Sequence, residues 1–297
     1  MGARGKLEIT VIGLGLVLAA VGMGVLSAPA RYQIEGAIRS GAYGAVIVGA
    51  VLLLVGLISF VVVAPIRNEP RAKQFGSHRA VIATTGLALL LSGLLPVALF
   101  RNRPDLGGQS LDGFLVAALS TAVSLLVLAY VRTQIPGLAT WRELGLRWEG
   151  LPSLVRRGLI GGLLLFGANI AYGLLMQQLG IVQDQMDAFI WVRALGPSQF
   201  LVVLALGAIV APVVEEVFFR GFVFGSYARR YGPRLGAILS STLFALLHAN
   251  LSVLVPILLM GLVLAWLYYR SGSLVPGIVA HGINNAIAFS LFYLIEI

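Results

Sequence analysis

Long runs of residues without a charged side chain recur along the chain and restrict its fold more than any other feature. A helix needs about 20 apolar residues to cross a membrane. The runs that approach or exceed this length are Ile9–Ala30, Ser40–Ile66, Ala80–Phe100, Gly113–Val131, Gly158–Gln183, Ala194–Val214, Leu235–Tyr269 and Ser271–Ile295. Leu235–Tyr269 is long enough for two helices, with a break around Asn250 to Pro256. The pattern predicts an all-α, polytopic bundle of about eight or nine transmembrane helices.

The composition agrees with a location in the membrane. Hydrophobic residues make up 59% of the chain and charged residues 11%, whereas soluble domains are about 25% charged. The absence of cysteine excludes disulfides and thiolate metal sites. The net charge of +9 does not require a nucleic-acid partner, because basic residues in the loops of a membrane protein set its topology. The expected partners are the lipid bilayer and a membrane-bound substrate.

The loop charges also predict an orientation. Most arginines and lysines fall on the side that holds the amino terminus, for example Arg4, Lys6, Arg229 and Arg230. Basic loops stay in the cytoplasm, so we expect a cytoplasmic amino terminus and a location in the inner or plasma membrane. The first apolar stretch is longer than the roughly 7–15 residues of a signal peptide. Residues 1–30 are therefore predicted to remain as an uncleaved first helix.

Two regions of the chain differ in their polar residues. Residues 1–110 hold three predicted helices without an intramembrane charge, and nothing in the sequence assigns them a role. Residues 111–297 hold the other helices and nearly every unusual polar residue. We therefore predict an N-terminal three-helix membrane region followed by the functional core.

A polar segment from Arg132 to Gly158 separates the predicted fourth and fifth helices. Trp141 and Trp148 stand among its arginines, a pattern typical of the membrane interface. The segment is predicted to be a helix that lies at the cytoplasmic surface without a catalytic role. Gly158 and Gly162 form a GxxxG pattern, which is weak evidence for helix packing.

Two adjacent carboxylates, Glu215 and Glu216, stand at the end of an apolar run. A charge near the bilayer centre costs roughly 2.5–3.5 kcal/mol, so their presence requires a partner or a function. Glu216 and Arg220 are four residues apart on a helix and are predicted to form an ion pair. Glu215 points about 100° away and is left free of this pair.

Further polar residues are predicted to meet Glu215 at one depth. His281 and Asn285 are four apart and share a helix face. Glu215 lies 17 residues before Gly232 and His248 lies 16 after it, so an antiparallel hairpin places them at nearly equal height. His281 lies at the same depth in the membrane as Glu215 and His248 if this hairpin projects further into the cytoplasm than the turn before His281. One cavity nearer the cytoplasmic face would then hold the carboxylate pair of Glu215 and Glu216, the two imidazoles and the Asn285 amide.

This set of residues suits the hydrolysis of an acyl bond, most simply a peptide bond. A free carboxylate beside a neutral imidazole can deprotonate a water molecule. A second imidazole and an amide can donate hydrogen bonds to the developing oxyanion. No serine or cysteine nucleophile is needed.

Three short motifs resemble those of a known family. "EEVFFR", "FALLH" and "HGINN" match the EExxxR, FxxxH and HxxxN/B motifs of the CPBP family, the CAAX-prenyl-protease-like intramembrane proteases. They occur in the family's order within about 70 residues, and "WRELGLRW" is similar to the family's usual lead-in. The resemblance covers roughly residues 110–297. It implies that residues 111–297 form a CPBP-like intramembrane protease core.

The resemblance implies a glutamate-dependent endopeptidase. The absence of an HExxH motif and the amide beside the histidine favour a site without a metal cofactor. Glu215 matches the base and His248 its partner, while His281 and Asn285 match the oxyanion donors. The predicted ion pair would support the site structurally. Eukaryotic members remove the last three residues of prenylated CAAX proteins, so the expected substrate is a membrane-associated or lipidated CAAX-like protein or peptide.

Two other classes of function use the same residues. Glu215, His248 and His281 could form a zinc site with two histidines and one carboxylate, which would make the protein a zinc metalloendopeptidase, although no HExxH motif is present. A non-catalytic membrane protein of immunity or transport could use the carboxylates as a proton relay. The internal repeats typical of transporters are not seen in the sequence.

Overall fold

The structure is a computed structural model that describes residues 78–100, 110–178, 189–248 and 253–294. Within these ranges the chain forms helices joined by turns, and no strand is present. The all-α membrane bundle predicted from the sequence is confirmed for this part of the chain. The first two predicted helices, and the prediction that residues 1–30 remain uncleaved, lie outside the described residues.

The described helices follow the predicted runs closely. They are α3 His78–Phe100, α4 Leu111–Thr133, α5 Leu151–Gln178, the short 3₁₀ helix η2 Ile190–Ala194, α7 Pro197–Ala205, η3 Leu206–Val210, α8 Ala211–Glu215, η4 Glu216–Phe224, α9 Gly225–Tyr231, α10 Pro233–Leu247, α11 Leu254–Ser271 and α12 Val275–Leu294. From α7 to α9 they form one continuous rod, in which η3 and η4 are π-helical. The predicted break between two helices is present, since α10 ends before α11 begins.

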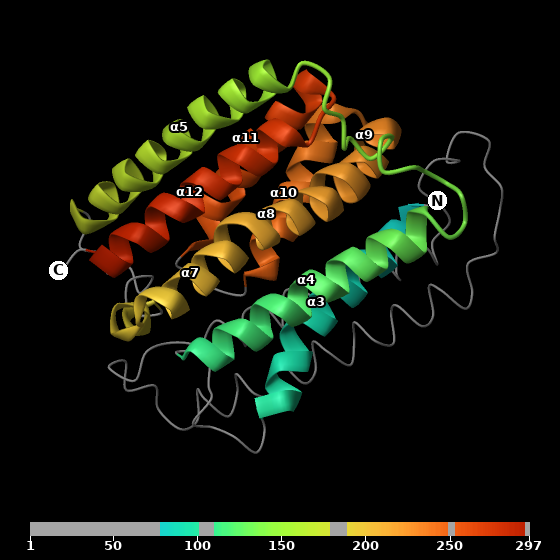
Figure 1. Cartoon of the computed structure of the whole chain (residues 1–297). Helices are drawn as coiled ribbons and strands as arrows, with labels where there is room; N and C mark the ends of the chain where they lie inside the picture. Colours follow the sequence, from blue (N-terminus) through green and yellow to red (C-terminus); the bar gives the residue numbers. More distant parts are fainter. Residues whose placement is uncertain (1–77, 101–109, 179–188, 249–252, 295–297) are drawn as a thin grey trace.

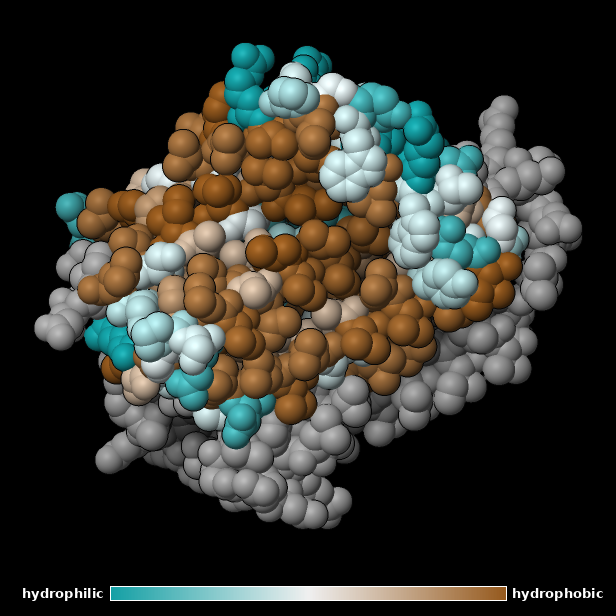
Figure 2. Space-filling model, in the orientation of Figure 1, coloured by the Kyte–Doolittle hydropathy of each residue, from teal (hydrophilic) through white to brown (hydrophobic). Residues whose placement is uncertain are grey.

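Within the described ranges, five segments are long and apolar enough to cross a membrane. They are Leu111–Thr133, Leu151–Leu174, Pro197–Tyr231, Leu254–Ser271 and Val275–Leu294. Large apolar side chains such as Leu164, Leu201 and Ile209 are more than half exposed, as expected of side chains that face lipid. Figure 2 shows hydrophobic residues over most of the face drawn, with hydrophilic residues gathered toward the ends of the helices.

Helix α12 is central to the arrangement that builds the site. It packs along α5 on one side, while α3 and α4 lie side by side across the rod of α7 to α9 (Figure 1). Glycines allow the close approach of α5, because a Cβ atom at Gly162 would lie 2.9 Å from the carbonyl oxygen of Ala280. A Cβ atom at Gly158 would lie 2.6 Å from Val279. The GxxxG pattern is therefore a packing motif here.

The segment between α4 and α5 is not the surface helix that the sequence predicted. Residues 134–150 form turns, and α5 begins at Leu151, before the uncharged run. Gly137, Gly145 and Gly150 have φ angles of 63°, 104° and 71°, positive values that glycine adopts readily and that a continuous helix cannot contain. Leu144 is fully buried, so the segment packs into the end of the bundle.

A capped turn and an aromatic contact stabilise this segment locally, and hydrogen bonds from Tyr268, Ser273 and Leu274 join it to the ends of α11 and α12. The backbone N–H of Thr140 donates to Glu143 at 2.7 Å, and the N–H of Glu143 points back to the Thr140 hydroxyl at 3.3 Å. This is the reciprocal pattern of a capping box. Trp141 stacks on Tyr130 with ring centroids 6.3 Å apart, whereas Trp148 is exposed.

Candidate active site

The rod from α7 to α9 places the two carboxylates at the change from α-helix to π-helix. Glu215 is the last residue of α8 and Glu216 the first of η4. Every residue of η4 is buried, so this turn lies inside the bundle. The π-helical turn widens the helix where the two side chains diverge, a geometry frequent at functional sites.

Glu216 and Arg220 form the predicted ion pair in complete burial. Their side chains are 0% exposed, and Arg220 Nη1 donates to Glu216 Oε1 at 2.6 Å. Arg220 Nη2 donates to the carbonyl oxygen of Gly261 at 3.3 Å. Its guanidinium carbon lies 4.3 Å from the ring centroid of Phe244, a cation–π contact. The arginine is therefore held by a carboxylate, a carbonyl and an aromatic ring.

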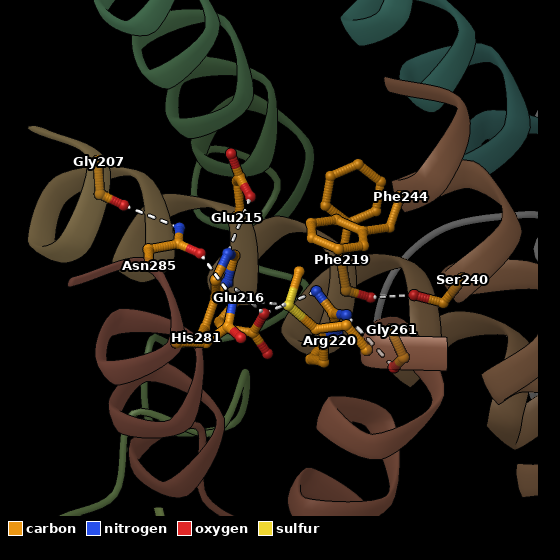
Figure 3. A network of polar contacts seen from close by, with 12 residues as sticks. Gly207, Glu215, Glu216, Phe219, Arg220, Ser240, Phe244, Gly261, His281 and Asn285 are labelled. Carbon is orange, nitrogen blue, oxygen red and sulfur yellow. Dashed lines mark hydrogen bonds and ion pairs between the residues drawn. The ribbon is translucent and has the colours of Figure 1, made fainter. Parts of the chain in front are cut away.

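His281 lies between the two carboxylates, as Figure 3 shows. Its Nδ1 is 3.4 Å from Glu216 Oε1, and its Nε2 is 3.8 Å from Glu215 Oε2. The ring is almost fully buried. Helix α12 approaches this closely because a Cβ atom at Gly277 would lie 2.8 Å from Glu216 Oε2. The imidazole thus connects the sealed carboxylate with the more open one.

His248 ends α10 and has a defined ring orientation. Its Nδ1 lies 3.0 Å from the carbonyl oxygen of Phe244. A carbonyl oxygen only accepts hydrogen bonds, so Nδ1 carries the proton and Nε2 of the neutral ring keeps a free lone pair. Phe244 also contacts both imidazoles edge to face, with centroids 5.0 Å from His248 and 5.7 Å from His281. One buried ring therefore spaces the two histidines.

The four residues predicted to act together meet in one place. Glu215, His248, His281 and Asn285 all line a largely apolar cavity of about 770 Å³. Its walls come from α4, α5, η3, α8, α10, α11 and α12, and Ser92 of α3 also contributes. Glu216 was expected in the same cavity but lies outside this lining, because its carboxylate is turned into the buried ion pair with Arg220. The structure thus separates the predicted support from the predicted reacting groups. The predicted boundary between an N-terminal region, residues 1–110, and a protease core, residues 111–297, stays a prediction. Helix α3 belongs to the N-terminal region, yet its Ser92 lines the cavity.

Asn285 belongs to a row of amides that the sequence analysis did not anticipate. Its Nδ2 donates to the carbonyl oxygen of Gly207 at 2.9 Å (Figure 3). Asn284 Nδ2 donates to Asn285 Oδ1 at 3.2 Å, and Asn169 Nδ2 donates to Asn284 Oδ1 at 2.9 Å. Asn169 interrupts an apolar run, and an amide inside a membrane helix is a usable signal. Gly207 acts through its backbone and leaves no side-chain signal.

The sequence left open whether Glu215, His248 and His281 bind a zinc ion. Among the residues that the structure describes, no group of three or more His, Asp or Glu side chains is arranged to hold a metal ion. The carboxylates and imidazoles can act as bases, acids and hydrogen-bond partners in their present places.

Comparison with known proteins supports the same region. The family model described as "Type II CAAX prenyl endopeptidase Rce1-like" matches residues 197–287. The UPF0177 protein YxdF of Lactococcus lactis is 29% identical over 89 residues, which cover 30% of this chain and 49% of that protein. A Bacillus subtilis protein named "Putative membrane peptidase YdiL" is 32% identical over 82 residues, 28% of this chain and 34% of that one.

The chain therefore spans half or less of the length of these relatives. No solved structure matches it significantly. The matched residues contain all three motifs and hold Glu215, His248, His281 and Asn285. Over residues 197–287 the chain is similar to the Rce1-like family of type II CAAX prenyl endopeptidases.

Proposed function

We propose that this protein is an intramembrane endopeptidase that hydrolyses a peptide bond with an activated water molecule. The observation that carries the proposal is the convergence of Glu215, His248, His281 and Asn285 on one largely apolar cavity. The names of the matching family model and of the Bacillus relative support a peptidase. A dry, apolar site strengthens each electrostatic contact with a developing charge.

In this proposal Glu215 is the base and His248 its partner. The water oxygen attacks the carbonyl carbon, and its proton passes to the Glu215 carboxylate. The free Nε2 of His248 accepts a hydrogen bond from the same water. When the carbon–nitrogen bond breaks, the departing amine takes the proton from Glu215, which returns to its starting state.

The oxyanion would be held by Asn285 and His281. Asn285 Nδ2 has two N–H groups, of which one is used by Gly207. The Nε2 atom of His281, which lies 3.8 Å from Glu215 Oε2, would supply the second hydrogen bond to the oxyanion.

The proposed substrate is a membrane-associated protein or peptide, prenylated or otherwise lipidated near a CAAX-like end. The apolar lining suits an apolar segment next to the scissile bond. The expected orientation has a cytoplasmic amino terminus and a site nearer the cytoplasmic face of the inner or plasma membrane. Residues 111–297 would form the protease core.

The direct test compares cleaved termini. Purified protein in lipid nanodiscs is incubated with membrane peptides, and new termini are identified by mass spectrometry. The Glu215→Gln variant is the matched control. Cleavage by the wild type alone supports the proposal. A wild type that cleaves nothing, or that transports protons without cleavage, would replace it with the non-catalytic alternative.

We further propose that catalysis needs no metal, because the chain lacks an HExxH motif and its carboxylate and imidazoles can activate water themselves. Turnover should survive prolonged treatment with a strong chelator, and purified active protein should contain well below one zinc ion per chain. Loss of turnover on chelation, restored by added zinc, would identify a zinc metalloendopeptidase that uses the same residues.

A further inference from the structure

The carbonyl group of Gly207 has lost its usual partner within the helix. In an α-helix it would accept from the N–H of Ala211, but that N–H donates to Leu206 in the π-helical turn η3. The π-helical donor would be residue 212, which is proline and has no N–H. The sequence therefore leaves a fixed acceptor inside the membrane bundle, where an unpaired carbonyl is costly.

Helix α12 is close enough to satisfy this carbonyl. A Cβ atom at Gly207 would lie 2.4 Å from the ring of Phe289, and one at Gly282 would lie 2.5 Å from the carbonyl oxygen of Ala208. These two glycines bring α12 and η3 together. Asn285 then donates to Gly207 at 2.9 Å.

The Gly207 carbonyl sets the direction of the whole row of amides. Because it only accepts, Asn285 must turn its NH₂ toward it and its Oδ1 away. Asn284 Nδ2 meets that Oδ1, and Asn284 in turn offers its Oδ1 to Asn169 Nδ2. If the Asn285 amide were reversed, its Oδ1 would face the carbonyl oxygen of Gly207, and its NH₂ would face the NH₂ of Asn284. Neither contact could then be a hydrogen bond. Each member therefore holds the next in one orientation.

We propose that Asn284 and Asn169 are positioning residues for the oxyanion donor Asn285. They fix its amide plane, so that the N–H not used by Gly207 faces the cavity. This inference rests on the proposed function and adds a residue of α5, outside the matched 197–287 region. The bonds run across helices, from α5 to α12 and on to η3, so the orientation depends on how the bundle packs.

The first test measures steady-state kinetics of Asn169→Leu, which keeps the size of the side chain and removes the donor. We expect kcat to fall about 10-fold with KM nearly unchanged, because a small misplacement of a transition-state group lowers turnover. Leu164→Ala, at an exposed position of the same helix, is the control and should keep the wild-type kcat. An active wild type with equal kcat in Asn169→Leu and Leu164→Ala would overturn the inference.

A second variant separates positioning from packing. Asn169→Asp keeps the shape, but its carboxylate cannot donate to Asn284, whereas its protonated form can. The ratio of its kcat to that of the wild type should rise as the pH falls. A ratio that is near one at every pH would show that only the shape of residue 169 matters.

A third measurement does not depend on activity. The melting temperatures of Asn169→Leu, Asn285→Ala and the double variant form a cycle. If the row acts as a unit, the double variant should lose less than the sum of the single losses, by about 2 °C. Additive losses would refute the row. A wild type that cleaves nothing would overturn the proposed function. The melting temperatures would still show whether Asn169 and Asn285 are coupled through Asn284.

Discussion

Glu215 and Glu216 are neighbours in the chain but occupy two different environments. Glu216 lies in a sealed region, fully buried and bonded to Arg220. Glu215 lines the cavity, and no cation is paired with it among the described residues except His281, if protonated. One step along a helix is enough to give the same side chain a structural environment or a reactive one. The contrast suggests that stability and turnover can be changed separately.

The sealed region is not a source of strong stability in itself. Glu216 Oε2, Arg220 Nε and His281 Nδ1 are buried without a hydrogen-bond partner within the described part of the chain. A buried ion pair often contributes little because both charges lose their hydration. Breaking it is a different matter, because the remaining charge has no compensation. The pair is better understood as a fixed support for His281 and Phe244.

The largest expected effect is the loss of turnover in Glu215→Gln. The amide cannot take a proton from water, so we expect kcat to fall by about 10³-fold or more. The melting temperature in detergent should stay near that of the wild type, because glutamine keeps the size of the side chain and the Glu216–Arg220 ion pair stays intact. Turnover close to that of the wild type would remove Glu215 as the base and with it the contrast between the two glutamates.

Glu216→Gln should show the opposite pattern, with stability affected first. It strands Arg220 without a counter-charge in complete burial, which typically costs about 3–5 kcal/mol. Melting in detergent and the yield of folded protein measure this loss. A restoring control is the double change Glu216→Gln with Arg220→Met, which removes both charges and should recover part of the loss. An unchanged melting temperature in Glu216→Gln would contradict the supporting role.

Asn285→Ala should lower kcat by about 10²–10³-fold with little change in KM, the usual effect of losing one oxyanion donor. Asn284→Ala should cost much less, about 10-fold, because it only loosens the orientation of Asn285. The double change His281→Ala with Asn285→Ala should cost less than the product of the single losses, since both serve one oxygen. A loss at Asn285 that lies wholly in KM would make it a substrate-binding residue.

The sequence was sufficient for features that follow from helical periodicity. The i,i+4 spacing predicted the pairing of Glu216 with Arg220, and nearly equal distances from Gly232 predicted that Glu215 and His248 meet in one cavity. Both results need only the rise and turn of a helix. Uncharged runs likewise located most of the described helices, because a membrane admits few other structures, but they did not extend to η4 and α9, which contain charged residues.

Features that depend on tertiary contacts could not be predicted in the same way. The π-helical turn at Gly207 follows from Pro212 and from the packing of α12 together, and neither is visible from local spacing. The segment that contains Trp141 has an interfacial composition, yet glycines with positive φ and the burial of Leu144 fold it inward. Asn169 meets Asn284 from 115 residues away, so its contact could not be read from the chain.

The smallest expected effect lies furthest from the cavity, in the capped turn of Thr140 and Glu143. Thr140→Ala removes the hydroxyl that contacts Glu143 and should lower the melting temperature by about 2 °C. The kcat should not change, because the turn lies outside the cavity lining. A fall in kcat would show that this segment is coupled to the site.

The pH dependence of this small effect has a definite sign. Hydrogen bonds from the Thr140 backbone and then its hydroxyl lower the pKa of Glu143. Because the pKa of Glu143 is lower in the folded state than in the unfolded state, its ionised carboxylate stabilises the folded state. This stabilisation is fully present above the unfolded pKa of about 4.3 and is lost as the pH falls through the folded pKa. The difference in melting temperature between wild type and Thr140→Ala should therefore shrink as the pH is lowered from 7 toward 3. In a Glu143→Gln background the difference should no longer depend on pH. A difference that persists unchanged at low pH would mean that Thr140 stabilises the turn without the Glu143 carboxylate.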